Sequence, residues 1–100
     1  MIETINYEEY CRVLLQGICR NSEVRITKHV DAMGVLLVAS GIVKQDMGTA
    51  IGREGKTISS IRNLVHVAGV FDHARVGLKI LEAGQTEYIP TATEKAENNF

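Results

Sequence analysis

The stretch that decides the fold is Ala50-Ile51-Gly52-Arg53-Glu54-Gly55-Lys56-Thr57. It holds two glycines three residues apart, with one base between them and another directly after the second glycine. Because glycine has no Cβ, a turn of this kind lets backbone N–H groups approach a phosphate closely. The stretch therefore predicts a phosphate-binding loop, and the phosphate could belong to a nucleotide or to a nucleic acid backbone.

The nucleotide interpretation fits this sequence less well. A P-loop requires a glycine, four further residues and then Gly-Lys-Ser/Thr. Gly55-Lys56-Thr57 matches the end of that pattern, but Ala50 stands where the first glycine is needed. A P-loop also follows a strand directly, whereas residues 46–51 predict a short helix with Asp46 as its N-cap. We therefore rank a nucleotide-binding enzyme below a nucleic-acid-binding protein.

An amphipathic helix follows the glycines. Its polar residues occupy one face, and its apolar residues recur at helical spacing on the other. The glycine turn then lies at the helix N-terminus, where free N–H groups and the helix dipole favour an anion. We expect these apolar side chains, and Ile51 before the loop, to pack in the core. The apolar positions are Ile58, Ile61, Leu64, Val65 and Ala68.

The rest of the chain predicts one more helix and three strands. Residues 7–20 form an amphipathic helix capped by Asn6, and residues 24–30 alternate as a half-buried strand. Residues 35–43 are apolar without alternation, which indicates a strand covered on both faces, and residues 75–80 alternate as a third strand. A tight turn makes the first pair antiparallel, and the helical crossover makes the second pair parallel. The fold class is thus α+β, in the order α-β-β-α-α-β, with a mixed three-stranded sheet and helices on one face.

The run from Val38 to Gly69, VASGIVKQDMGTAIGREGKTISSIRNLVHVAG, resembles a KH domain of the prokaryotic type II. It is most similar to the small stand-alone bacterial KH proteins, which carry Asp-Met-Gly, Ile-Gly-x-x-Gly-Lys/Arg-Thr and Ile-Arg-x-Leu in this order. The resemblance is tight over residues 38–69 and extends, in element order, over residues 7–82. It implies the type II KH fold with its three helices on one face of the sheet. It also implies RNA binding in a groove about four nucleotides long, with the glycine loop clamping the backbone.

The same resemblance implies a non-catalytic protein that grips short single-stranded RNA, without a cofactor, as an RNA chaperone or post-transcriptional regulator. It also implies pairing, either as a homodimer or with another KH-containing protein. The alternative is a KH-fold protein-interaction module with little RNA binding, which the acidic Glu54 in the loop would favour. The expected RNA contacts are Gly52, Arg53, Glu54, Gly55, Lys56 and Thr57, with Arg62 and Lys44 on the flanking helices. The resemblance also implies an alternative to the core for Ile51, Ile58 and Ile61, because apolar residues near these positions form the floor on which bases rest in KH domains.

Charge is distributed unevenly along a chain whose net charge is only −1. From Lys44 to Lys79 there are six bases and three acids, while the rest of the chain carries five bases and nine acids. Positive charge therefore surrounds the glycine loop. So small a number of bases argues against a general polyanion binder and predicts modest affinity for RNA.

The 100 residues are sufficient for one domain. We assign residues 1–82 to the KH domain and expect residues 83–100, which contain the only proline, to form a flexible C-terminal tail. No signal peptide is evident, and no apolar stretch is long enough to span a membrane. We expect a cytoplasmic protein without membrane contact.

Cysteine and histidine do not indicate a metal or redox centre. Cys11 and Cys19 lie eight positions apart on one predicted helix, too far along its axis to form a disulfide with each other. We expect both to be free core residues, as in a reducing cytoplasm. The three histidines lack metal-ligand spacing, and no Ser/His/Asp set or carboxylate pair suggests a catalytic centre.

Overall fold

The computed structural model describes residues 5–82 of the chain. The expected tail, residues 83–100, lies outside the described residues. The predicted element order is confirmed, with a single 3₁₀ turn inserted at the glycine loop. The elements are α1 (Tyr7–Ile18), β1 (Arg25–Asp31), β2 (Gly34–Ser40), α2 (Lys44–Ile51), a 3₁₀ turn (Arg53–Gly55), α3 (Lys56–Phe71) and β3 (Val76–Ile80).

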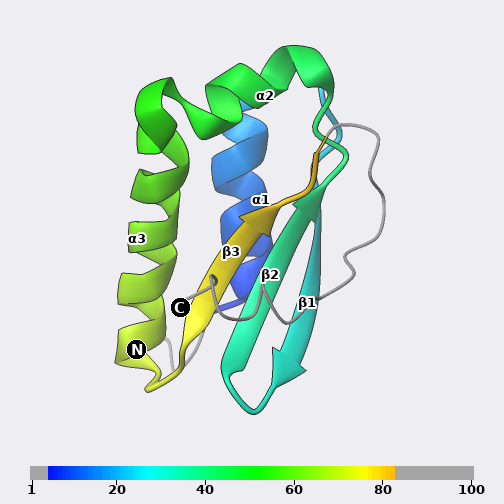
Figure 1. Cartoon of the computed structure of the whole chain (residues 1–100). Helices are drawn as coiled ribbons and strands as arrows, with labels where there is room; N and C mark the ends of the chain where they lie inside the picture. Colours follow the sequence, from blue (N-terminus) through cyan, green and yellow to red (C-terminus); the bar gives the residue numbers. More distant parts are fainter. Residues whose placement is uncertain (1–4, 83–100) are drawn as a thin grey trace.

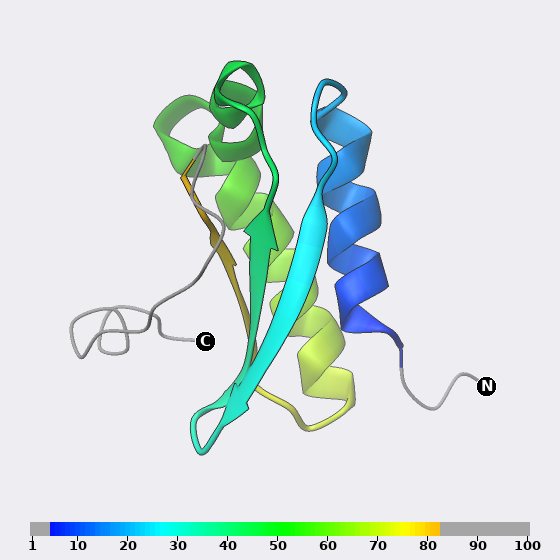
Figure 2. The ribbon, with the colours of Figure 1, turned by 90° about the vertical axis from the view of Figure 1, so that its right-hand side faces the viewer.

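The three strands form one mixed sheet in the order β1-β2-β3. β1 and β2 are antiparallel, with Lys28 opposite Leu37, and β2 and β3 are parallel, with Leu37 opposite Leu78. The helices lie on one side of this sheet, and α2 joins its upper end to the start of α3 (Figures 1 and 2). This is the predicted α+β arrangement of a type II KH domain.

The main core lies between the sheet and the helices. Its most deeply buried side chains come from α1, β2, α3 and β3 and from the residue after α1. The central strand β2 is buried on both of its faces, as its unbroken apolar sequence predicts. The largest fully buried side chains are Leu15, Leu37, Val65, Val76, Cys11 and Cys19.

Two features of the chain match the sequence in detail. The side chain of Asn6 accepts a 3.0 Å hydrogen bond from the backbone N–H of Glu9, so the predicted N-cap of α1 is confirmed. Cys11 and Cys19 are free and buried, and burial raises the pKa of both thiols, that of Cys11 to about 12. None of the helices within residues 5–82 is long and apolar enough to cross a membrane.

The prediction that Asp46 caps α2 is wrong. The helix begins two residues earlier, at Lys44, because Val43 already has extended backbone and its carbonyl accepts from the N–H of Asp46. Asp46 therefore lies in the first turn, where only 4% of its surface is exposed. It accepts hydrogen bonds from the backbone and side-chain nitrogens of Asn21, at 2.9 and 3.0 Å, and from the Ser22 hydroxyl, at 2.6 Å. These bonds, that of Ser22 first, lower its pKa and fasten the α1–β1 loop to α2.

Two apolar residues that the sequence assigned to the core lie at the surface. Leu64 is 46% exposed and Ile51 is 44% exposed. On α3 the buried face follows Ile58, Ile61 and Val65, and Leu64 is rotated about 100° away from Val65. Helical spacing alone did not separate these faces, because α3 carries more apolar residues than its core-facing stripe can hold.

The N-terminus of α1 is joined to the C-terminus of α3 through Tyr7. The Tyr7 hydroxyl donates to a carboxylate oxygen of Asp72 and lies 3.2 Å from the carbonyl oxygen of Ala68. Burial and then the hydrogen bond to Asp72 raise the pKa of Tyr7 to about 12. The protonated phenol is therefore part of the contact between the two long helices.

This contact predicts a specific dependence of stability on alkaline pH. Between pH 10 and about 12 the unfolded chain loses the Tyr7 proton while the folded chain keeps it, so the free energy of unfolding falls as pH rises through this range. Tyr7→Phe removes that term, and the stability advantage of the wild type over Tyr7→Phe should shrink between pH 10 and about 12. Urea unfolding at a series of pH values measures it. Tyr10→Phe is the matched control, and parallel curves for the wild type and Tyr7→Phe would contradict the assignment.

Candidate nucleic-acid interface

Gly52 has a backbone conformation that only glycine adopts readily. Its φ and ψ are 79° and 171°, and a Cβ added there would lie 2.7 Å from the backbone nitrogen of Thr57. The Thr57 backbone could move away from such a Cβ only if the first turn of α3 were displaced. Gly52 therefore allows α2 to end directly against the start of α3.

The two residues after Arg53 turn the chain through the left-handed region. Glu54 has φ 55° and Gly55 has φ 73°. The N–H of Gly55 donates to the carbonyl of Gly52 at 3.1 Å, and the N–H of Lys56 donates to the carbonyl of Arg53. In contrast to Gly52, Gly55 has open space around its Cβ position, so only its backbone angles favour glycine.

The loop is followed directly by a helix N-terminus that no side chain caps. α3 is 16 residues long, Gly55 is its N-cap, and no side chain forms a hydrogen bond at this cap. Its first turn also carries no acidic residue. Free N–H groups and the positive end of the helix dipole thus face outward next to the loop, and an anion could bind there.

The charged side chains of the loop remain free to contact a ligand. Arg53, Glu54 and Lys56 are exposed, and within residues 5–82 none of them forms an ion pair. Two bases and one acid leave one net positive charge at this point. The loop can attract a phosphate, although Glu54 opposes its two neighbours.

The structure places the remaining predicted contact residues at different distances from the loop. Thr57 lies within it, in van der Waals range of Gly52. Arg62 is on α3 about 9 Å further along the helix, and its Nε donates to the carbonyl of Leu78 at 2.9 Å. Lys44 is exposed at the far end of α2, about 10 Å from Ile51 along the helix axis. Only Gly52 to Thr57 therefore form one compact group.

Two parts of the surface beside the loop, Ile51 and the outer edge of β3, lie outside the predicted set of contact residues. Ile51 is exposed directly before the loop, because the buried face of α2 follows Asp46 and Ala50. Within residues 5–82, β2 is the strand that pairs with β3, and the other edge of β3 lies beside α3 (Figure 1). Arg62 links α3 to that edge through Leu78. The exposure of Ile51 depends on the rotation of α2, which the sequence pattern did not determine.

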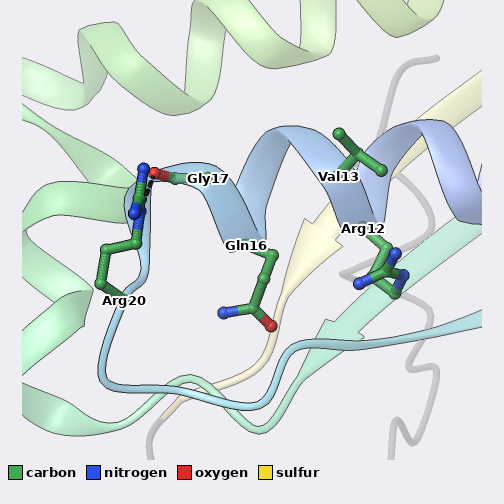
Figure 3. Close-up of a pocket in the computed structure, with 5 residues that line it drawn as sticks. All are labelled: Arg12, Val13, Gln16, Gly17 and Arg20. Carbon is green, nitrogen blue, oxygen red and sulfur yellow. Dashed lines mark hydrogen bonds between the residues drawn. The ribbon is translucent and has the colours of Figure 1, made fainter.

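A shallow hollow of about 340 Å³ lies elsewhere, along α1 (Figure 3). Its polar groups already have partners within the chain: Arg12 pairs with Glu9, Arg20 donates to the carbonyl of Gly17, and Gln16 holds the α1–β1 loop through Cys19, Ser22 and Val24. We assign no ligand to it. Within residues 5–82, no group of three His, Cys, Asp or Glu side chains is arranged to hold a metal. The lining residues are Arg12, Val13, Gln16, Gly17 and Arg20.

Comparison with known proteins identifies several similar small bacterial proteins. The chain is 38% identical over 76 residues to RNA-binding protein KhpA of Chlamydia pneumoniae, and the match covers 75% of this chain and 96% of the relative. RNA-binding protein KhpA of Chlamydia trachomatis is 28% identical over 75 residues, again 75% of this chain and 96% of the relative. The protein of the same name from Halalkalibacterium halodurans is 32% identical over 60 residues, which cover 60% of this chain and 78% of the relative. No family model matches the chain, and no solved structure gives a significant match.

The geometry of the loop predicts unequal effects of substituting its two glycines. Gly52→Ala forces a Cβ against the backbone of Thr57 and should lower the free energy of unfolding by about 3 kcal/mol or more. Gly55→Ala meets no atom closer than 4.0 Å and should cost only about 1–2 kcal/mol, for its left-handed backbone. Chemical denaturation of the two variants measures the difference. Equal losses would show that Gly52 is not held against α3 as described.

Proposed function

The chain belongs to the KhpA family of RNA-binding proteins, and from this premise we propose that it is a non-catalytic protein that holds the backbone of short single-stranded RNA through the loop Gly52–Gly55. The observation that carries the proposal is the conformation of Gly52, which places the loop against the uncapped N-terminus of α3. The relatives are named RNA-binding proteins, and the loop offers the kind of phosphate site that such a protein requires.

The loop accounts for the backbone part of recognition. A phosphate at the start of α3 would accept from N–H groups of the first helical turn, and Arg53 and Lys56 would supply mobile positive charge beside it. These contacts hold RNA and carry no sequence information. The adjoining bases would rest on the surface between α3 and the outer edge of β3, with the exposed Ile51 at one end and Arg62 within it. Sequence selectivity would arise there.

Modest affinity follows from the small number of charges. One net positive charge at the loop gives a weak contact with a shallow dependence on salt. A second RNA-binding unit, in a homodimer or in another KH-containing protein, would raise the overall affinity by multivalency. α3 offers an apolar stripe for such contacts, in which Leu64 and Val67 are each 46% exposed and Phe71 is 82% exposed. Our proposal includes this pairing. It also includes a role in the cytoplasm as an RNA chaperone or post-transcriptional regulator.

The proposal excludes phosphate transfer by the same loop. Ala50, at the position of the first P-loop glycine, is fully buried inside α2, and α2 separates the loop from the end of β2. Lys56 therefore begins a helix and does not follow a loop that could wrap around a nucleotide. ATP or GTP hydrolysis that Lys56→Ala abolishes would overturn this point.

A protein-interaction module with little RNA binding is the second candidate. The exposed stripe of α3 and the acidic Glu54 in the loop favour it. Self-association that survives nuclease treatment and is lost in Phe71→Asp, together with no RNA crosslinks at residues 52–57, would support this candidate over the first.

Reversing the charge of the loop should strongly weaken RNA binding. In the double variant Arg53→Asp/Glu54→Asp, the loop loses its central base, and we expect the affinity for a short single-stranded RNA to fall by about tenfold or more. Filter binding or a gel shift at a fixed salt concentration measures it. The circular dichroism spectrum should stay unchanged, since both side chains are exposed.

Arg75→Asp is the matched control for this charge reversal. Arg75 is exposed beyond the far end of α3, so the variant changes the net charge by the same amount away from the loop. It should retain most of the affinity. Equal losses in the two variants would point to general electrostatics, and unchanged binding in the loop variant would refute the clamp.

Removing the negative charge of Glu54 should strengthen binding. In Glu54→Gln the side chain keeps its size while its repulsion of the phosphate disappears, and screened repulsion of about 1 kcal/mol or less corresponds to a gain of up to about fivefold. Titration of the same RNA measures the change, which should diminish as salt is raised. A loss of affinity would mean that Glu54 makes a favourable contact with RNA.

A further inference from the structure

The sheet has a second apolar cluster on the face away from the helices. Along β2, Leu37 and Ala39 belong to the main core, and the alternate residues Leu36 and Val38 form a separate cluster with Leu81. Because successive side chains of a strand point to opposite faces, this second cluster lies on the face that α1 and α3 do not cover (Figure 2).

The neighbouring residues on that face do not account for the deep burial of this cluster. Leu36 is 7% exposed, and Val38 and Leu81 are 2% exposed. Across the sheet, Leu36 lies between His29 and Gly77, and the latter has no side chain.

Val38 lies in the same way between Thr27 and Lys79. Among residues 5–82, every helix packs on the opposite face. The neighbouring side chains stand beside these residues on the same face, and the low exposure of all three points to a cover from outside this range.

We propose that residues 83–100 fold back over this face and cover Leu36, Val38 and Leu81. The segment begins two positions after Leu81, where β3 has already ended, and Ala83-Gly84 provides residues suited to a turn. A return across the face from Leu81 to the level of Gly77 spans about 13 Å, and residues 85–89 reach about 16 Å when extended. The run Tyr88-Ile89-Pro90 supplies the apolar side chains.

Charge supports the same occupant. Residues 83–100 carry Glu87, Glu94 and Glu97 against a single base, Lys95. The face that they would cover carries Lys79 opposite Val38 and Arg25 opposite Ser40, where Glu23 also lies 3.7 Å from Arg25, and Asp31 lies at the other end of β1. An acidic segment with one apolar run thus matches a face with an apolar centre and a base beside it.

The four N-terminal residues fit this role poorly. They precede Ile5 and α1, which packs on the helical side of the sheet, and four residues span at most about 14 Å. They would have to pass around an edge of the sheet to reach Val38. The C-terminal segment starts at the cluster itself.

Thiol protection in the full chain tests the proposal. Val38→Cys is a nearly isosteric change, and its reaction with Ellman's reagent reports whether position 38 is covered. We expect slow reaction in this variant and a rate about tenfold or more higher when Tyr88→Asp/Ile89→Asp is added. Thr91→Asp/Thr93→Asp adds the same charge to the same segment and should leave the thiol protected. Cys11 and Cys19 serve as an internal check, because global unfolding would make three thiols react and local detachment only one.

Each other outcome overturns the proposal. A thiol at position 38 that reacts rapidly in the otherwise unchanged chain would mean that the face is open. Protection that persists in Tyr88→Asp/Ile89→Asp would mean that another part of the chain covers it. Protection that disappears on dilution, with the segment intact, would assign the face to a second copy of the chain.

Discussion

The contact between Gly52 and the first turn of α3 is the constraint on which the binding surface depends. A Cβ at Gly52 would lie 2.7 Å from the Thr57 nitrogen, so the backbone of α2 ends in contact with the backbone that starts α3. This contact sets where the two helices meet, leaves the α3 N-terminus without a side-chain cap and directs Arg53 and Lys56 outward. Binding capacity at this point is a consequence of backbone geometry first and of charge second.

The rest of the fold holds that contact in place from both ends. Asp46 fixes the first turn of α2 to the α1–β1 loop through three hydrogen bonds, and Tyr7 fixes the last turn of α3 to the start of α1. The two helices that flank the loop are therefore each attached at the end remote from it. The loop can be exposed and lightly packed because its position does not rely on its own side chains.

The sequence predicted what depends on local pattern and missed what depends on the rotation of elements. The Asn6 cap, the glycine spacing and the alternation of the strands are local patterns, and the element order and the sheet topology agreed with them. The half-buried face expected along residues 24–30 is confined to Val24 and Ile26, because β1 is an edge strand of which Val30 is 68% exposed. Ile51 and Leu64 were placed in the core, because spacing shows that a helix is apolar and does not show which apolar residues face inward. Asp46 was predicted to be an N-cap because the sequence does not show the residues that it contacts. Its partners Asn21 and Ser22 are 25 and 24 positions away, and no local pattern indicates them.

The geometry of the loop favours binding of a phosphate, whereas its charge weakens that binding. The conformation of Gly52, the left-handed Glu54 and the open helix end form the phosphate site that we propose, yet an acid lies at its centre and the chain carries a net charge of −1. A side chain at position 54 is exposed, and the backbone there would accept other residues at similar cost, so nothing in the fold requires glutamate. In the proposed site, weak binding is then a property of this side chain and can be adjusted without altering the fold. A protein that binds each RNA segment weakly exchanges it quickly, and it gains strength only where several such sites act together.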